Sequence, residues 1–124
     1  MVAITEHVAK AGNRKVLPTP ALMAYWFHRL NAEVFDEWLP TPAFSVGSPK
    51  ATWGLFTVGI DDAITVHLAD HWLTKEQFLD ILVHELVHLW QYIAAEPIAH
   101  GPSFTRWAPI IKARTGLTLR KSYV

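Results

Sequence analysis

The segment His84-Glu85-Leu86-Val87-His88 places two histidines four residues apart within the longest strongly helical stretch of the chain, residues 74–93. Side chains at this spacing lie one above the other on one face of a helix, so the two imidazoles can bind a single metal ion. Glu85 lies beside them, where a carboxylate that does not bind the metal can take a proton from a water that the metal activates. The segment therefore predicts zinc-assisted hydrolysis of an amide bond.

The helix that carries these histidines is apolar on nearly all of its faces. Its apolar residues are Phe78, Leu79, Ile81, Leu82, Val83, Leu86, Val87, Leu89, Trp90 and Ile93. A helix of this kind is expected to be buried. Buried histidine and glutamate side chains need partners, and a metal ion supplies one, so a metal site is favoured over two ordinary core or surface histidines.

A catalytic zinc usually has three protein ligands and leaves its fourth position to water, so a third ligand is needed. The candidates are His100, Glu96, His71 and Asp70. The extended pattern with glycine and histidine three and six residues after the second ligand is absent, because Gln91 and Ala94 occupy those positions. His100 is preferred, because Gly101 allows a sharp turn and Pro102 suits the first turn of a new helix, but the other three stay open.

The surrounding pattern predicts an α+β fold of short strands and flanking helices. Apolar residues follow helical spacing from residue 21 to Trp38, where Pro40 and Pro42 stop the helix. Residues 43–46, 52–58 and 63–68 are rich in β-branched and aromatic side chains and are separated by turn residues at 47–49 and 59–62. They predict a three-stranded, mostly antiparallel sheet packed on the metal helix.

Helix boundaries are also marked. Thr74 and Gln77 form a capping box at the start of the metal helix. Residues 102–114 are expected to form a last helix that Gly116 ends. Residues 1–19, which end in two prolines, are expected to be a lead segment or a first short helix, followed by one domain over residues 20–124.

Taken together, the motifs resemble the SprT-like (Spartan/SprT) zinc metalloprotease family, whose signature is a His-Glu-x-x-His helix followed by a His-Gly-Pro-x-Phe turn. The turn here reads His100-Gly101-Pro102-Ser103-Phe104. Upstream, residues 30–36 and Leu39-Pro40 are similar to the family's opening helix and its exit, and strands at 51–58 and 63–68 lead into the metal helix. Downstream, residues 110–118 resemble its closing helix and last strand, so the resemblance covers about residues 20–120.

The resemblance implies a small zincin-like domain and an endopeptidase acting on a protein or peptide substrate. It implies that His84, His88 and His100 bind Zn²⁺ and that Glu85 is the general base. It also implies a role in DNA–protein crosslink repair, with DNA localising or activating cleavage. Longer members carry a separate DNA-binding module, so in this chain we expect any DNA contact to come from the protease domain itself.

Composition narrows the remaining function classes. A chain of 124 residues without cysteine is expected to form one domain and has neither a disulfide framework nor a cysteine-rich zinc module. No stretch is long and apolar enough to cross a bilayer, and residues 1–12 lack the apolar core of a signal peptide. The expected location is the cytoplasm.

Charge is distributed unevenly along the chain. Residues 1–30 carry +3, residues 31–96 carry −8 and residues 97–124 carry +5. The basic residues of the last segment are Arg106, Lys112, Arg114, Arg120 and Lys121. They are candidate contacts to DNA phosphates, although ordinary solvated side chains, with Lys112 and Arg114 near a helix C-terminus, explain the same pattern.

A second hypothesis is a non-catalytic module in which zinc is structural and the basic C-terminus binds DNA or a protein. A structural zinc is normally closed by four protein ligands, so Glu96 or Asp70 in the fourth position would favour this alternative. Three imidazoles also suit Mn, Co or Ni, and the family resemblance favours zinc. Candidates for stabilising the oxyanion are His67, Tyr92 and Arg106.

Overall fold

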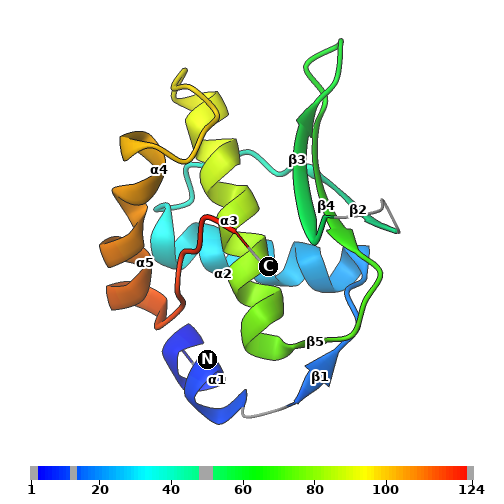
Figure 1. The fold of residues 1–124 in the computed structure, drawn as a ribbon, viewed down its shortest axis with the longest axis vertical. Helices are drawn as coiled ribbons and strands as arrows, with labels where there is room; N and C mark the ends of the chain where they lie inside the picture. The colour runs from blue at the N-terminus through cyan, green and yellow to red at the C-terminus, as the bar shows by residue number, and fades with distance from the viewer. Residues whose placement is uncertain (1–2, 12–13, 48–51, 123–124) are drawn as a thin grey trace.

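The computed structural model describes residues 3–11, 14–47 and 52–122 and confirms the α+β class (Figure 1). One long helix, α3, lies between a small sheet on one side and α4 and α5 on the other, while α2 crosses behind it. In chain order the elements are α1 (Ile4–Ala11), β1 (Lys15–Val16), α2 (Pro20–Val34), β2 (Ala43–Gly47), β3 (Gly54–Val58), β4 (Ile64–Ala69), β5 (Leu73–Thr74), α3 (Lys75–Ile93), α4 (Pro102–Thr105) and α5 (Trp107–Thr115).

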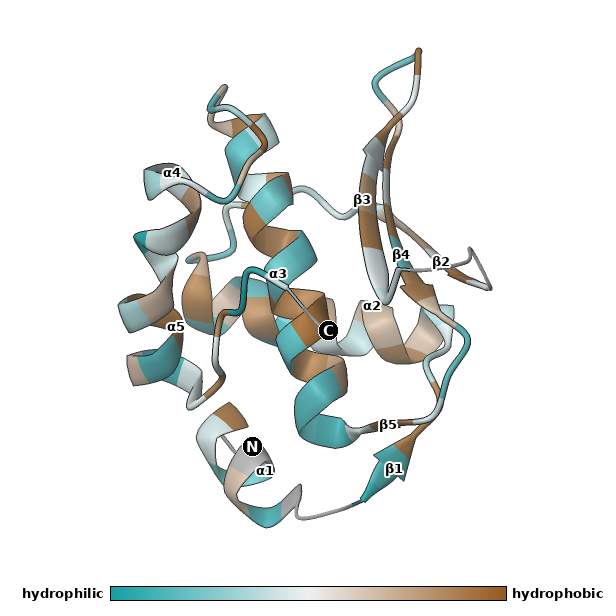
Figure 2. Ribbon diagram, in the orientation of Figure 1, coloured by the Kyte–Doolittle hydropathy of each residue, from teal (hydrophilic) through white to brown (hydrophobic). Residues whose placement is uncertain are grey.

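The central helix α3 begins and ends as its sequence predicts. The Thr74 side chain accepts from the Gln77 backbone N–H at 3.1 Å, and the Thr74 N–H donates to the Gln77 side chain at 3.0 Å, which completes the capping box. Every residue from 78 to 89 is buried. Figure 2 shows that α3 carries hydrophobic residues over most of its length, interrupted by hydrophilic ones. This burial makes α3 a rigid support for the side chains of the candidate site.

The sheet beside α3 has three strands in the order β2-β4-β3. The predicted mostly antiparallel pairing is only half right, because β3 pairs antiparallel with β4 whereas β2 pairs parallel with it. The tight turn at residues 59–62 can only join antiparallel neighbours, but the longer connection from β2 to β3 lets the central strand β4 lie between them. Ser48, Pro49 and Ala51 of the predicted turn and strand lie outside the described residues, and β3 begins at Gly54.

Helix α2 ends four residues before the predicted end at Trp38. Asp36 and Glu37 take left-handed backbone conformations, with φ of 54° and 62°, which no α-helix can contain. Asn31 stabilises this turn, because its side chain donates to the Leu39 carbonyl at 3.0 Å and accepts from the Leu39 N–H at 3.1 Å. The buried Leu39 side chain then continues the core that α2 began.

The predictions for the two ends of the chain agree with the structure in part. The predicted last helix is divided at Arg106 into α4 and α5, and Gly116, with φ of 78°, ends α5 as expected. The lead segment contains both α1, whose Ile4 is fully buried, and β1, which pairs antiparallel with β5 at the start of α3. Part of the core therefore comes from residues before 20. No helix in the described ranges is long and apolar enough to cross a membrane.

Candidate metal centre

Three histidine nitrogens converge at one point beside α3. Nε2 of His88 lies 3.2 Å from Nε2 of His84 and 3.2 Å from Nε2 of His100, and the third side of the triangle is 3.3 Å. Nitrogens bound at about 2.0–2.1 Å to a tetrahedral zinc ion stand about 3.3–3.4 Å apart, so the triangle has nearly the size that such an ion requires. The three histidines form a group that could hold a metal ion.

Hydrogen bonds on the far side of two rings determine their tautomers. Nδ1 of His84 lies 2.6 Å from the backbone carbonyl oxygen of Arg120, which can only accept, so this nitrogen carries the proton. Nδ1 of His88 likewise donates to Oε1 of Gln91 at 2.8 Å. The Gln91 amide is oriented unambiguously, because its Nε2 donates to the Ala99 carbonyl and to Ser103 Oγ, both at 2.9 Å.

With both Nδ1 atoms protonated, the Nε2 atoms of His84 and His88 present lone pairs to each other at 3.2 Å. Two lone pairs at this distance repel unless a cation lies between them. Burial also lowers the pKa of His84 to about 4 and lowers that of His88, which keeps both imidazoles neutral, as metal ligands must be. The donor set therefore fits a divalent transition-metal ion.

The His-Gly-Pro-x-Phe turn brings His100 to the site and packs it there. Gly101 begins α4, and its carbonyl accepts from the Phe104 N–H at 2.9 Å, so the Phe104 ring turns back beneath the histidines. The centroid of that fully buried ring lies 4.9 Å from those of His84 and His100 and 5.2 Å from that of His88. One aromatic side chain thus supports all three imidazoles.

Glu85 lies beside the triangle, with its Oε2 3.9 Å from Nε2 of His84. The side chain is almost fully buried, and burial raises its pKa to about 8. A cation at the three histidines would favour its ionised form. Close approach of β3 encloses it further, because a Cβ at Gly54 would stand only 2.9 Å from Oε2 of Glu85.

The triangle opens into a cleft of about 460 Å³. One wall is β3, from Gly54 to Phe56, and the opposite wall is α3 with the loop before α4. Lys121 and Ser122 of the C-terminal segment border it as well. His100 and the flanking Ile98 are exposed, so the metal centre is accessible from solvent.

The other candidates from the sequence lie elsewhere. Glu96, Asp70 and His71 are exposed, and within the described residues only the three histidines form a metal-binding group. None of the three oxyanion candidates lines the cleft. Tyr92 donates to Asp62 at 3.1 Å, His67 is paired with Ser45 Oγ at 2.8 Å, and Arg106 lies over the Trp90 ring.

The five basic candidates for DNA contact differ in what they contact in the fold. Arg114 donates to the Val34 carbonyl at 2.7 Å, Lys112 donates to the Gly116 carbonyl, and Arg106 stacks on Trp90. Arg120 borders a second hollow beside α3, and Lys121 lines the cleft itself. The DNA contacts remain a prediction.

Sequence reasoning missed the groups that orient the site. Gln91 was used only to exclude the extended motif, which has glycine at this position. A glutamine on an apolar helix, three residues after a metal ligand and fully buried in the fold, itself indicates a hydrogen-bond partner for that ligand. Gly54 could have been noticed as a glycine within a strand, which often marks a close approach. The Arg120 carbonyl has no signature in the sequence.

Comparison with known proteins agrees with this geometry. The SprT-like family model matches residues 23–122 of the chain, a range that contains all three histidines and Glu85. No curated protein matches the chain.

Proposed function

This chain belongs to the SprT-like family, and from that premise we propose that it is a zinc-dependent endopeptidase with Glu85 as its general base. The observation that supports the proposal most strongly is the triangle of Nε2 atoms with a buried carboxylate at its edge. The SprT-like family is associated with zincin-like metalloproteases, and this agrees with the proposal. The accessible cleft beside the triangle agrees with it as well.

The metal would be held by His84, His88 and His100, with an open position facing the cleft. Zinc in such a site polarises a substrate carbonyl and lowers the pKa of water to about 7. Zinc is chosen over the other metals that imidazoles bind because of the family and the near-tetrahedral spacing of the nitrogens.

Glu85 would move the proton. Its carboxylate is close enough to the triangle to accept a proton from a water placed there and to pass it to the departing amine. Its burial excludes bulk water from this transfer. Gly54 holds the strand wall against the carboxylate, which restricts its rotation.

The substrate would bind as an extended strand along β3. In the described sheet, β3 is an edge strand, and its residues from Gly54 to Phe56 form one wall of the cleft. Backbone hydrogen bonds to such an edge supply affinity without demanding a particular sequence. The scissile bond would then lie between β3 and the three histidines.

The finer proposal, that the substrates are proteins bound or crosslinked to DNA, rests on the family resemblance and on Arg120 and Lys121. Both residues are exposed near the cleft, where phosphate contacts would bring a DNA-bound protein to the site. Replacing both by glutamine should reduce cleavage of a DNA-bound protein and not of the same protein without DNA. Equal loss on both substrates would contradict this part.

The alternative of a structural zinc in a non-catalytic module requires a fourth protein ligand. Glu96 and Asp70, which could have supplied it, are exposed and outside the histidine group. The open position therefore favours catalysis.

Metal removal and return test the proposal. The zinc-loaded protein should cleave an unfolded polypeptide, lose this activity with a chelator and regain it when zinc is added. A protein that binds zinc in the triangle but leaves every unfolded polypeptide intact would support the non-catalytic alternative instead.

A further inference from the structure

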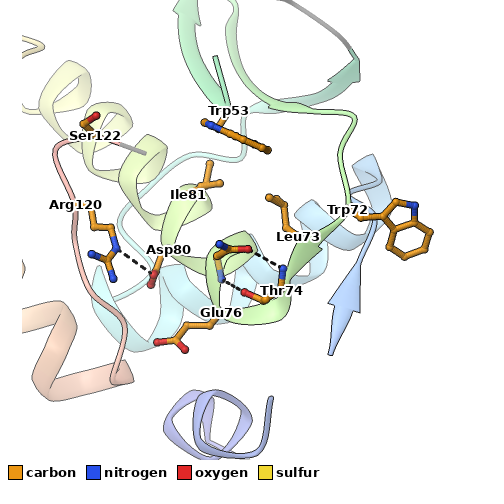
Figure 3. Close-up of a pocket in the computed structure, with 10 residues that line it drawn as sticks. Trp53, Trp72, Leu73, Thr74, Glu76, Asp80, Ile81, Arg120 and Ser122 are labelled. Carbon is orange, nitrogen blue, oxygen red and sulfur yellow. Dashed lines mark hydrogen bonds and ion pairs between the residues drawn. The ribbon is translucent and has the colours of Figure 1, made fainter. Parts of the chain in front are cut away.

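A second hollow, of about 510 Å³, adjoins the cleft along α3 (Figure 3). We call it the Trp53 hollow. Its apolar walls are Trp53, Leu73 and Ile81, and its charged residues are Glu76, Asp80 and Arg120. Trp53 and Ser122 line both the hollow and the cleft, so the two spaces are neighbours.

The hollow lies one helical turn from the catalytic carboxylate. Ile81 and Glu85 are four residues apart on α3, and a Cβ at Gly54 would touch both, at 2.8 Å and 2.9 Å. A strand that pairs antiparallel with β3 runs from Phe56 toward Trp53, so the residues that follow the scissile bond come next to the hollow. A side chain of one of them can enter it.

The charges in the hollow favour a cation. Among its described lining residues the hollow has two carboxylates, of Glu76 and Asp80, and one guanidinium, that of Arg120. The Arg120 side chain is 57% exposed and its Nε stands 3.9 Å from Oδ2 of Asp80, so this pair is loose. Burial and, to a smaller extent, the nearby charge of Glu76 raise the pKa of Asp80 to about 6, against the lowering effect of the Thr118 N–H, Arg120 and Lys112. An added cation beside Glu76 and Asp80 would relieve the repulsion between the two carboxylates.

The walls favour a long stem. In Figure 3 the Trp53 ring covers the hollow from the β3 side, opposite Ile81 and Leu73. Lysine and arginine carry aliphatic stems that pack on such surfaces, and their charged ends interact with indole faces. A substrate glutamate in the hollow would be repelled by Glu76 and Asp80. A purely apolar side chain would fit the walls but would bring no positive charge to the two carboxylates.

We propose that the Trp53 hollow is a subsite that binds the side chain of a lysine or arginine which follows the scissile bond of the polypeptide substrate. This subsite rests on the proposed endopeptidase function and adds to it a preference for a basic residue after the scissile bond. Glu76, Asp80 and Trp53 are the residues that determine the preference.

Matched peptides test the subsite. Unstructured peptides identical except at the first or second residue after the scissile bond carry lysine, norleucine or glutamate there. For one of these positions, kcat/KM should be at least about tenfold higher with lysine than with glutamate, with norleucine between them. Equal kcat/KM for the three peptides at both positions would overturn the subsite and leave the endopeptidase proposal intact.

Substitutions at Glu76 assign the preference to the hollow. Glu76→Gln should reduce the lysine-over-glutamate ratio several-fold, and Glu76→Lys should reverse it. Glu37→Gln is the matched control, because Glu37 is exposed in the turn after α2, outside both hollows. A ratio that stays unchanged in both Glu76 variants would contradict the proposal.

Binding to zinc-loaded Glu85→Gln separates the two proposals. If the wild-type protein cleaves no peptide but the variant binds the lysine peptide several-fold more tightly than the glutamate peptide, and Glu76→Lys reverses this order, the subsite holds and the endopeptidase proposal fails. If the wild-type protein cleaves no peptide and the variant binds the lysine and glutamate peptides equally, the subsite and the endopeptidase proposal are both overturned.

Discussion

Gln91 accepts through Oε1 the hydrogen bond that Nδ1 of His88 donates at 2.8 Å, three residues earlier on the same helix. Its Nε2 donates to the Ala99 carbonyl and to Ser103 Oγ, which flank His100 in the chain. The fully buried Gln91 side chain therefore connects two of the three histidines of the triangle and orients one of them.

The first prediction is that Gln91→Leu weakens zinc binding by about 10–100-fold, because outer hydrogen bonds orient metal-binding imidazoles. Leucine keeps the buried volume, so the fold should be retained. Competition with a chromophoric chelator measures the affinity, and circular dichroism checks the fold. Ser103→Ala, which removes only one of the three hydrogen bonds, should have a smaller effect. Unchanged affinity in Gln91→Leu would show that this residue does not position the site.

The second prediction concerns the C-terminal segment, whose Arg120 carbonyl accepts from Nδ1 of His84 at 2.6 Å. A chain that stops after Leu119 lacks this carbonyl and should bind zinc about 10-fold more weakly or worse. The anchor between Asp80 and the Thr118 N–H, at 3.2 Å, remains in place. Arg120→Ala is the control, since it keeps the carbonyl and should retain most of the affinity. Equal losses of zinc affinity in the shortened chain and in Arg120→Ala would show that the Arg120 side chain matters and its carbonyl does not.

The third prediction is that Gly54→Ala reduces kcat/KM by about 100-fold, because a misplacement of about 1 Å near reacting groups is this costly. The added Cβ would stand 2.8 Å from Cγ2 of Ile81 and 2.9 Å from Oε2 of Glu85, so the strand or the carboxylate must move. Gly101→Ala is the matched control, because a Cβ there meets nothing within 4 Å. Similar activity in the two variants would show that close approach of β3 does not matter.

The fourth prediction follows from the pKa of Glu85, which burial raises from 4.5 to about 8. Between these values the folded, metal-free protein retains a proton that the unfolded chain has released, so its stability falls as pH rises through this window. Glutamine at this position does not titrate. The stability advantage of metal-free Glu85→Gln over wild type should therefore grow from about pH 5 to about pH 8.5, by up to about 4 kcal/mol.

Thermal or denaturant unfolding at the two pH values measures this difference. The other titrating groups, including Asp80 and His84, are present in both proteins and so largely cancel. Zinc should abolish the trend, because its charge stabilises the ionised carboxylate. A difference that is constant with pH would mean that Glu85 is ionised in the metal-free fold.

Local patterns predicted the parts of the structure that depend on neighbouring residues. The capping box of Thr74 and Gln77 defined the start of α3, and the glycine and proline after His100 indicated the turn that brings it to the helix. His84 and His88 were predicted from their spacing on the helix, and His100 through this turn and the family motif. Each of these signals spans only a few residues.

What escaped prediction depends on contacts between distant residues. The parallel pairing of β2 with β4 follows from where the chain crosses, which strand patterns do not encode. The early end of α2 depends on the pairing of Asn31 with Leu39 rather than on the prolines that follow. The acceptor for His84 is a backbone carbonyl, which any residue at position 120 would supply.

The central claim is that Glu85 moves a proton at a metal held by three histidines. The most direct test compares wild type with Glu85→Gln for both zinc content and cleavage of an unfolded polypeptide. The account predicts that the variant binds zinc as the wild type does and cleaves at least about 100-fold more slowly, as loss of a general base requires. Equal cleavage by the two zinc-loaded proteins would contradict it.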